Sequence, residues 1–298
     1  MEIRQIQYFL SIVETGSFSN AAEELYISQS SLSKQIIALE EELGVQLFDR
    51  SKRKIFLTNA GEVFLEHARK MDELYKALRA DIDRFSSGAD TLSIVAIPVM
   101  AQYGIPSLIA HFKNTYPNIK FTLDEREGIN ILPALKAHEY DLAFIRDNYI
   151  DKNQFQCITI CEDELDLVVS LRHQQANRPS ISLKELSNEN FIMFDKVTIL
   201  HDLILDECTK AGFRPRIFYA SVRIESILGL VASNIGVALM AKKIFDYYNP
   251  PDLVAIPLDE VIKSNVSLVY LTGKKLSGSA RTFIDLVTSK IETEGHID

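Results

Sequence analysis

The 298-residue sequence predicts a multidomain α+β protein with a helical N-terminal domain, a long helix and a C-terminal α/β domain. Three observations support this fold class. Apolar residues first recur at helical spacing, a single long helical pattern follows, and short apolar runs then alternate with amphipathic segments. We place the first domain at residues 1–58, the linker helix at 59–88 and the α/β domain at 91–298.

The composition is that of a globular protein, because 47% of the residues are hydrophobic and the formal net charge is only −9. No apolar run approaches the roughly 20 residues of a membrane helix, and the N-terminus lacks the pattern of a secretion signal. We therefore expect a cytoplasmic protein without a membrane partner. The acidic balance does not indicate nucleic-acid binding, so such a role requires a local basic surface.

The three cysteines do not form the pattern of a disulfide framework or a zinc site. Cys157 and Cys161 lie in "FQCITICEDELDLVVS", which reads as strand, and four strand residues span about 13 Å, beyond disulfide reach. We expect all three thiols to be small buried hydrophobic groups, and a redox role of Cys208 stays open.

The first domain begins with two helices. Apolar residues at helical spacing run from Ile3 to Val13, and Gly16 is expected to end that helix. Ser17 or Ser19 can cap a short second helix, "NAAEELY", whose alanines suit close packing.

The third helix, "SQSSLSKQIIALEEELG", is polar at its start and amphipathic afterwards. Ser28 is the expected N-cap and Gly44 follows the last turn. A solvated polar face explains Ser28, but it explains less well the serines that follow, because other residues have a higher helix propensity. The expected apolar stripe consists of Leu32, Ile36, Leu39 and Leu43.

A β-hairpin with a basic tip follows. The apolar runs "VQLF" and "IFL" flank "DRSKRK", and three helices with such a hairpin predict a winged helix-turn-helix. On its own, a charge run is as often a solvated turn. The basic side chains of this tip are Arg50, Lys52, Arg53 and Lys54.

The long helix predicts dimerisation. Asn59 is the expected cap, with Glu62 at the capping-box position. A helix of about 40 Å is unstable in isolation and needs a partner, which is either a second copy, our preferred interpretation, or the helix's own domain. The apolar residues at a near-heptad spacing are Phe64, Met71, Leu74, Leu78, Ile82 and Phe85.

From residue 91 the pattern predicts two Rossmann-like subdomains. Strands such as "TLSIVAI" and "DLAFI" alternate with helices such as "IPSLIAHFKNTYP", which predicts a mostly parallel sheet with right-handed crossovers. A second set of strands and helices follows, and the last strand and helix can return to the first set. We expect subdomain I at about 91–161 and 266–298, and subdomain II at about 162–265.

The segment "GSFSNAAEELYISQSSLSKQIIALEEELGVQLFDRSKRKIFLTNAG" resembles the DNA-binding region of LysR-type transcriptional regulators. The resemblance continues through the long helix and the two subdomains, so it covers essentially the whole chain. The family usually has arginine at the position of Lys34, and lysine keeps the charge but not the bidentate geometry. We therefore expect Lys34 to contact a phosphate.

The resemblance implies that the third helix enters the major groove of pseudo-palindromic double-stranded DNA and that the hairpin is the wing. Residues 1–58 carry six basic and eight acidic side chains, and four of the basic ones lie on the hairpin. We expect the wing to carry most of the salt dependence. The candidate DNA-binding residues are Ser28, Gln29, Ser30, Ser31, Ser33, Lys34, Arg50, Lys52, Arg53 and Lys54.

The resemblance also implies a periplasmic-binding-protein-like domain with a small-molecule effector between its subdomains. Ligands of α/β sheets bind beyond the carboxyl ends of strands. Arg146 and Arg223 can clamp a carboxylate, which makes an organic anion the hypothetical effector, or they can pair with Asp147 and Glu225. The candidate effector-binding residues are Pro98, Val99, Met100, Ala101, Gln102, Gly128, Ile129, Arg146, Phe194, Thr198 and Arg223.

The family forms dimers or dimers of dimers, so a homodimer or homotetramer is expected, with RNA polymerase as a further candidate partner. The competing classes are an enzyme and a solute-binding protein. The six histidines have no metal-ligand spacing, and no glycine-rich phosphate loop or nucleophile elbow occurs. We therefore expect no catalytic site, no metal and no cofactor.

Overall fold

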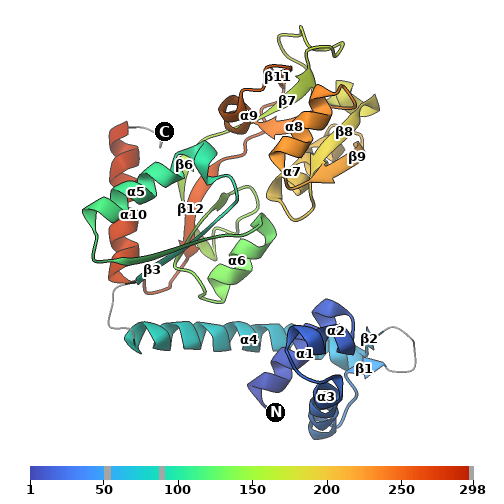
Figure 1. The fold of residues 1–298 in the computed structure, drawn as a ribbon, viewed down its shortest axis with the longest axis vertical. Helices are drawn as coiled ribbons and strands as arrows, with labels where there is room; N and C mark the ends of the chain where they lie inside the picture. Colours follow the sequence, from blue (N-terminus) through green and yellow to red (C-terminus); the bar gives the residue numbers. More distant parts are fainter. Residues whose placement is uncertain (50–54, 87–90, 295–298) are drawn as a thin grey trace. The chain divides into compact units, whose positions relative to one another are not determined.

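The structure is a computed structural model, and it describes residues 1–49, 55–86 and 91–294 (Figure 1). The chain divides into two compact units, residues 1–87 with 136–139 and residues 88–135 with 140–298. Among the described residues, no helix is both long enough and apolar enough to cross a membrane.

The N-terminal unit packs three helices, a short hairpin and the start of a long helix around one aromatic cluster. The ring of Phe9 lies 5.0 Å from that of Phe48 and 4.8 Å from that of Phe64, which joins the first helix to the hairpin and to the long helix. The elements are α1 (Ile3–Thr15), α2 (Phe18–Glu24), α3 (Gln29–Leu43), β1 (Phe48–Asp49), β2 (Phe56–Leu57) and α4 (Asn59–Ser86).

The helix ends follow the predicted caps. Gly16 and Gly44 end α1 and α3 in the left-handed conformation, with φ of 66° and 70°. Ser17 caps α2 by accepting hydrogen bonds from two backbone amides of the first turn. The expected apolar stripe of α3 is wrong at one place, because Leu43 is 38% exposed in the last turn, where the helix extends past the domain core.

The predicted cap of α4 is wrong by one residue. The Oγ1 of Thr58, not the side chain of Asn59, accepts the hydrogen bond from Gly61 N at 3.0 Å. The same hydroxyl donates to the carbonyl of Gln46 at 2.6 Å, so the hairpin selects Thr58 as the cap. A Cβ on Gly61 would lie 2.1 Å from the carbonyl oxygen of Leu47, so this contact requires glycine.

Subdomain I of the second unit is a five-stranded sheet in the order β4-β3-β5-β12-β6. Helices α5 and α10 lie side by side against it, and the rings of Phe112 and Phe283 meet 5.0 Å apart between them (Figure 1). The elements are β3 (Thr91–Ala96), α5 (Ile105–Thr115), β4 (Lys120–Glu125), α6 (Gly128–Lys136), β5 (Leu142–Arg146), β6 (Phe155–Cys161), β12 (Val266–Leu271) and α10 (Gly278–Glu294), with the 3-10 helix η1 (Met100–Tyr103) after β3.

Subdomain II contains the antiparallel sheet β10-β7-β11 and the parallel pair β8-β9. A bridge between Phe191 and Val237 joins the pair to the end of β10. The elements are β7 (Leu165–Ser170), η2 (Leu183–Asn188), β8 (Asn190–Phe194), α7 (Ile199–Lys210), β9 (Arg216–Ser221), α8 (Ile224–Ala232), β10 (Ala238–Ala241), α9 (Lys242–Tyr248) and β11 (Leu253–Pro257).

The expectation of mostly parallel sheets in the C-terminal domain is wrong, because four of the described strand pairs are antiparallel and three are parallel. Strands β3, β4 and β5 are parallel, but β12 is antiparallel to both β5 and β6, and β7 is antiparallel to β10 and β11. The reason is that the chain crosses between the subdomains twice, so the returning strand enters its sheet from the opposite end. The run from Phe155 to Ser170 accordingly holds two strands of different sheets, separated by residues 162–164.

Candidate DNA interface and effector cleft

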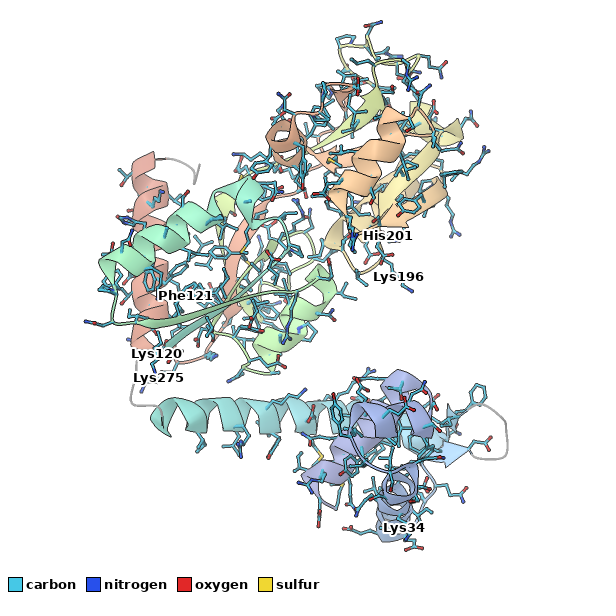
Figure 2. All side chains as sticks on the ribbon, viewed as in Figure 1. Lys34, Lys120, Phe121, Lys196, His201 and Lys275 are labelled. Atoms are coloured by element: carbon cyan, nitrogen blue, oxygen red, sulfur yellow. The ribbon has the colours of Figure 1, made fainter. Side chains whose placement is uncertain are left out.

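The first turn of α3 presents polar side chains while its apolar face is buried. Leu32 and Ile36 are fully buried, and Gln29, Ser31 and Lys34 are exposed. Figure 2 shows Lys34 on this helix. The positive end of the helix dipole and the exposed polar side chains therefore lie on one surface, which suits a phosphate backbone.

Two of the candidate serines contribute to the cap. Ser28 Oγ accepts from Ser31 N at 3.2 Å and lies 3.1 Å from Ser30 Oγ. Ser33 is only half-buried, one turn further on. Ser30 therefore lies against the cap, whereas the side chains of Gln29, Ser31 and Lys34 extend from it into solvent.

Tyr26 is a feature of this surface that sequence reasoning missed. It lies in the turn between α2 and α3, is 96% exposed, and has a φ of 54°, a region that non-glycine residues rarely adopt. Its position in the turn, two residues before the N-cap Ser28, could have indicated from the sequence that it is exposed.

The predicted wing has its two strands in place. Phe48 pairs with Leu57 and Asp49 with Phe56 in antiparallel register. Glu40 of α3 holds the hairpin, since its Oε1 accepts from the amides of Leu47 and Phe48 at 2.8 and 3.1 Å. The four basic candidates, Arg50, Lys52, Arg53 and Lys54, lie outside the described residues.

The apolar residues of α4 divide into two groups. Phe64 packs edge-on against Phe9 in the domain core. Met71, Leu74, Leu78 and Ile82 are 41%, 72%, 56% and 56% exposed. The side chain of Phe85 lies outside the described ones. An exposed apolar row of this kind on a long helix is the surface expected of an unpaired coiled-coil seam.

A small cavity of about 60 Å³ lies between the two subdomains of the second unit, where the sequence predicts an effector site, and we therefore call it the effector cleft. Six of the candidate effector-binding residues line it: Pro98, Val99, Gly128, Arg146, Phe194 and Thr198. Five do not: Met100, Ala101, Gln102, Ile129 and Arg223. Sequence reasoning missed the other lining residues: Ile97, Glu127, Ile199, Leu200, Val222, Ile224 and Ile244.

The subdomains touch directly beside this cleft. A Cβ on Gly128 would lie 2.8 Å from Cγ1 of Ile199, so only glycine allows α6 to approach α7 this closely. Ile129 N donates to the carbonyl of Val197 at 3.3 Å across the same boundary. At the outer edge, the hydroxyl of Tyr149 donates to Asp206 Oδ2 at 2.7 Å.

Arg146 belongs to a buried network at the crossing strands rather than to an ion pair with Asp147. Its Nη1 donates to the carbonyl and the Oγ of Ser264 at 2.7 and 2.8 Å, and its Nη2 donates to the Tyr103 hydroxyl at 2.8 Å. That hydroxyl in turn donates to Asp163 Oδ2 at 2.6 Å. Burial raises the pKa of Tyr103, so the phenol stays protonated. The expected two-arginine clamp is not assembled, because Arg223 lies outside the cleft lining.

The polar groups of the cleft differ in how they are satisfied. Thr198 Oγ1 donates to the carbonyl of Asp195 at 2.8 Å and accepts from His201 N as the cap of α7. Figure 2 shows His201 on this helix, where its Nδ1 lies 2.8 Å from the carbonyl oxygen of Phe194. Burial, followed by the nearby carboxylates of Asp195 and Glu125, raises the pKa of Glu127.

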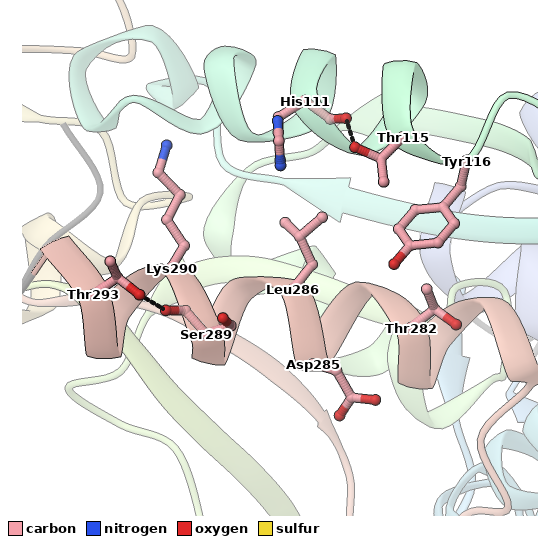
Figure 3. A pocket seen from close by; sticks show the side chains of 9 residues that line it. All are labelled: His111, Thr115, Tyr116, Thr282, Asp285, Leu286, Ser289, Lys290 and Thr293. Atoms are coloured by element: carbon pink, nitrogen blue, oxygen red, sulfur yellow. Dashed lines mark hydrogen bonds between the residues drawn. The ribbon is translucent and has the colours of Figure 1, made fainter.

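A larger and more open groove of about 750 Å³ lies on subdomain I between α5 and α10 (Figure 3). Its walls are mostly polar, with His111 and Thr115 on one side and Asp285 and Lys290 on the other. None of the candidate effector-binding residues lines this groove, whereas six of them line the effector cleft.

The cysteines do not form a reactive pair. Cys161 and Cys208 are buried, all three thiols are free, and burial raises the pKa of Cys208 to about 12. Such a thiol is protonated at neutral pH and is a poor nucleophile. Within the described ranges, no three His, Cys, Asp or Glu side chains are grouped so that they could hold a metal ion.

Comparison with known proteins matches both parts of the chain to family models. Residues 3–62 match the bacterial regulatory helix-turn-helix of the LysR family, and residues 86–292 match the LysR substrate binding domain. The chain is 32% identical over 289 residues to the HTH-type transcriptional regulator YwbI of Bacillus subtilis, covering 96% of this chain and 95% of that protein. It is 29% identical to the transcriptional dual regulator GltC of the same organism, covering 98% and 99%.

Solved structures agree in fold along the whole length. HinK, a LysR family transcriptional regulator from Pseudomonas aeruginosa, is 27% identical, with a TM-score of 0.59 and coverage of 97% of this chain and 98% of that one. Full-length CbnR complexed with its target DNA is 23% identical, with a TM-score of 0.60 and coverage of 97% and 99%. The second likeness concerns the fold alone.

Proposed function

This chain belongs to the LysR family of DNA-binding transcriptional regulators, whose C-terminal domain binds effectors, and we propose that the first turn of its α3 reads DNA while the effector cleft receives a small molecule. The observation that carries the DNA-binding part is the division of α3. Leu32 and Ile36 hold the helix on the domain, whereas Gln29, Ser31 and Lys34 stay exposed at its N-terminal end.

In this proposal the polar side chains have different tasks. Gln29 can form a bidentate pair with adenine, and Ser31 can donate or accept at several base edges. Lys34, with Ser28 and Ser30 at the cap and Ser33 behind it, contacts the phosphate backbone. The wing residues Arg50, Lys52, Arg53 and Lys54 supply most of the sequence-independent attraction.

Fluorescence anisotropy with DNA from upstream of the chain's own gene tests this assignment. Gln29→Ala is expected to weaken specific binding by about 1–3 kcal/mol, because a bidentate base contact is lost. Lys34→Ala is expected to weaken binding to all sequences and to reduce the slope of log K against log salt by about 1. Glu41→Ala, at the exposed far end of α3, is the matched control and should not weaken either.

The proposal is contradicted if Gln29→Ala and Glu41→Ala bind the specific DNA equally well. A salt slope that stays unchanged in Lys34→Ala would place that lysine away from the phosphates.

We propose that the effector occupies the cleft between subdomain I, at about 91–161 and 266–298, and subdomain II, at about 162–265. The cleft joins residues that lie at or just after the carboxyl ends of β3, β4, β5 and β8, and that is where α/β domains bind ligands. Its volume admits only a few non-hydrogen atoms unless the subdomains separate. Gly128→Val is expected to wedge the subdomains apart and to abolish the response to effector while leaving DNA binding without effector intact.

The proposed assembly is a homodimer through α4, or a dimer of such dimers, on a pseudo-palindromic site. The exposed row of Met71, Leu74, Leu78 and Ile82 supports it. The helix at 59–88 would then separate the DNA-binding domain at 1–58 from the effector domain at 91–298. RNA polymerase remains a candidate partner of the DNA-bound form.

The relatives that match over the full chain are regulators, and we propose that this chain has no enzymatic activity and works in the cytoplasm, where its DNA target lies. OxyR of Escherichia coli, a DNA-binding transcriptional dual regulator, is 26% identical over 307 residues. Several relatives of similar identity are named hydrogen peroxide-inducible genes activators. Cys208 is unsuited to sensing peroxide, because it is buried and its raised pKa keeps the thiol protonated.

A further inference from the structure

The walls of the effector cleft are chiefly apolar. Around Gly128, the side chains of Val99 and Phe194 come from the strand ends of the two subdomains, and α7 and α8 supply aliphatic side chains. A ligand that fits this cavity must therefore be small and carry an aliphatic body.

The two polar side chains that could bind an anion are already engaged. Thr198 caps α7 and donates to the Asp195 carbonyl. Arg146 donates to Ser264 and to Tyr103, and Tyr103 passes a hydrogen bond to Asp163. An anion in the cleft would have to compete with a buried, hydrogen-bonded charge network.

Glu127 is different, because it lines the cleft and lies near two other acids, Asp195 and Glu125. Burial, and then the charges of Asp195 and Glu125, raise the pKa of Glu127. The neighbouring Arg126 stacks over the ring of Tyr140, with Cζ 5.0 Å from the centroid. In the described part of the chain, no lysine or arginine forms an ion pair with Glu127.

Building on the proposed function of this cleft, we infer that the effector is a small aliphatic amine. Its ammonium group pairs with Glu127, and its hydrocarbon body lies against Val99, Phe194 and Ile199. A cation there relieves the repulsion among the acids, whereas the organic anion expected from the sequence would increase it. An ammonium group also supplies the hydrogen-bond donors that a carboxylate acceptor requires.

Three ligands with the same hydrocarbon body test this inference on the full chain: isobutylamine, isobutanol and isobutyrate. Each is added at equal concentration and the thermal unfolding of the C-terminal domain is followed. Isobutylamine is expected to raise Tm by about 2 °C or more at a saturating concentration. Isobutanol should have a smaller effect, and isobutyrate should have none.

Two matched variants locate the ammonium group. Glu127→Gln keeps the size of the side chain and removes its charge, and it should weaken isobutylamine binding about tenfold or more in isothermal titration. Glu125→Gln removes the same charge two residues away, outside the cleft lining, and should change the affinity by less than about threefold. The Tm of the C-terminal domain without ligand reports that both variants are folded.

Each outcome of the ligand and variant measurements supports or overturns the assignment of an amine effector. Amine binding that depends on Glu127 supports the inference. Stabilisation by isobutyrate, or an equal loss in both variants, overturns the amine assignment and leaves an effector cleft in place. No stabilisation by any of the three ligands also overturns it, while the proposed DNA-binding function is judged separately by the Gln29 and Lys34 variants.

Discussion

The hydroxyl of Tyr103 connects two buried charges where the chain crosses between the subdomains, and Tyr103→Phe removes only that hydroxyl. It donates to Asp163 Oδ2 at 2.6 Å and accepts from Arg146 Nη2 at 2.8 Å. A hydrogen bond to a charged group contributes about 1.5–3 kcal/mol, so the loss of both should lower the free energy of unfolding by about 3–5 kcal/mol. For a domain of this size each kcal/mol shifts Tm by about 2–4 °C, so we expect a fall of about 10 °C.

Tyr140→Phe is the matched control. Its hydroxyl donates to Asp124 Oδ2 at 2.8 Å, in the sheet of subdomain I. It should lower stability by about 1–2 kcal/mol when both variants are compared by urea unfolding of the C-terminal domain. If Tyr103→Phe costs no more than Tyr140→Phe, the buried network does not stabilise the crossing between subdomains and the reasoning fails.

Three further results are expected. Leu74→Glu should convert the proposed dimer to monomers in light scattering, because it places a charge in the exposed row of α4. Arg69→Glu lies on the opposite side of the helix and should leave the assembly unchanged. Burial raises the pKa of Asp166, although the ammonium group of Lys242 lies 4.0 Å from its carboxylate. The folded chain therefore holds the proton of Asp166 more tightly than the unfolded chain does. The contribution of Asp166 to the free energy of unfolding consequently falls as the pH rises. Asp166→Asn should therefore raise Tm at neutral pH, and the gain should vanish as the pH falls toward about 4. Cys208→Ser should leave DNA binding unchanged with and without peroxide in an anisotropy assay, because the raised pKa of the buried thiol keeps it unreactive.

The N-terminal unit could be predicted closely because its signals are local. Ser28, Gly16 and Gly44 were identified as caps from their residue type and position alone, and the structure confirms all three. The cap of α4 could not be predicted, because Thr58 and Asn59 are both good capping residues. The choice between them depends on a hydrogen bond to Gln46 in the hairpin, which is a tertiary contact.

Of the residues that line the effector cleft, only those at or after the ends of strands could be predicted from the sequence. The rule that ligands bind beyond strand termini found Val99, Gly128 and Phe194. It missed Ile244, because the antiparallel strands of subdomain II bring α9 to the cleft from a direction that a parallel sheet would not. Glu127 was missed because a single glutamate at a strand end has no sequence signal until burial and neighbouring acids become visible.

The same short segment connects the cleft to the crossing strands. Val99 lines the cavity, and Tyr103, four residues later in η1, holds Arg146 and Asp163. Gly104, with a φ of 66°, ends η1 and starts α5, which is anchored in the core of subdomain I. A ligand that displaces Val99 therefore has to move Tyr103 or strain the turn between them. Asp163 lies in residues 162–164, where the chain first crosses to subdomain II. Such a movement therefore changes the contacts of this crossing segment, and a change of that kind can reorient two subdomains as rigid bodies.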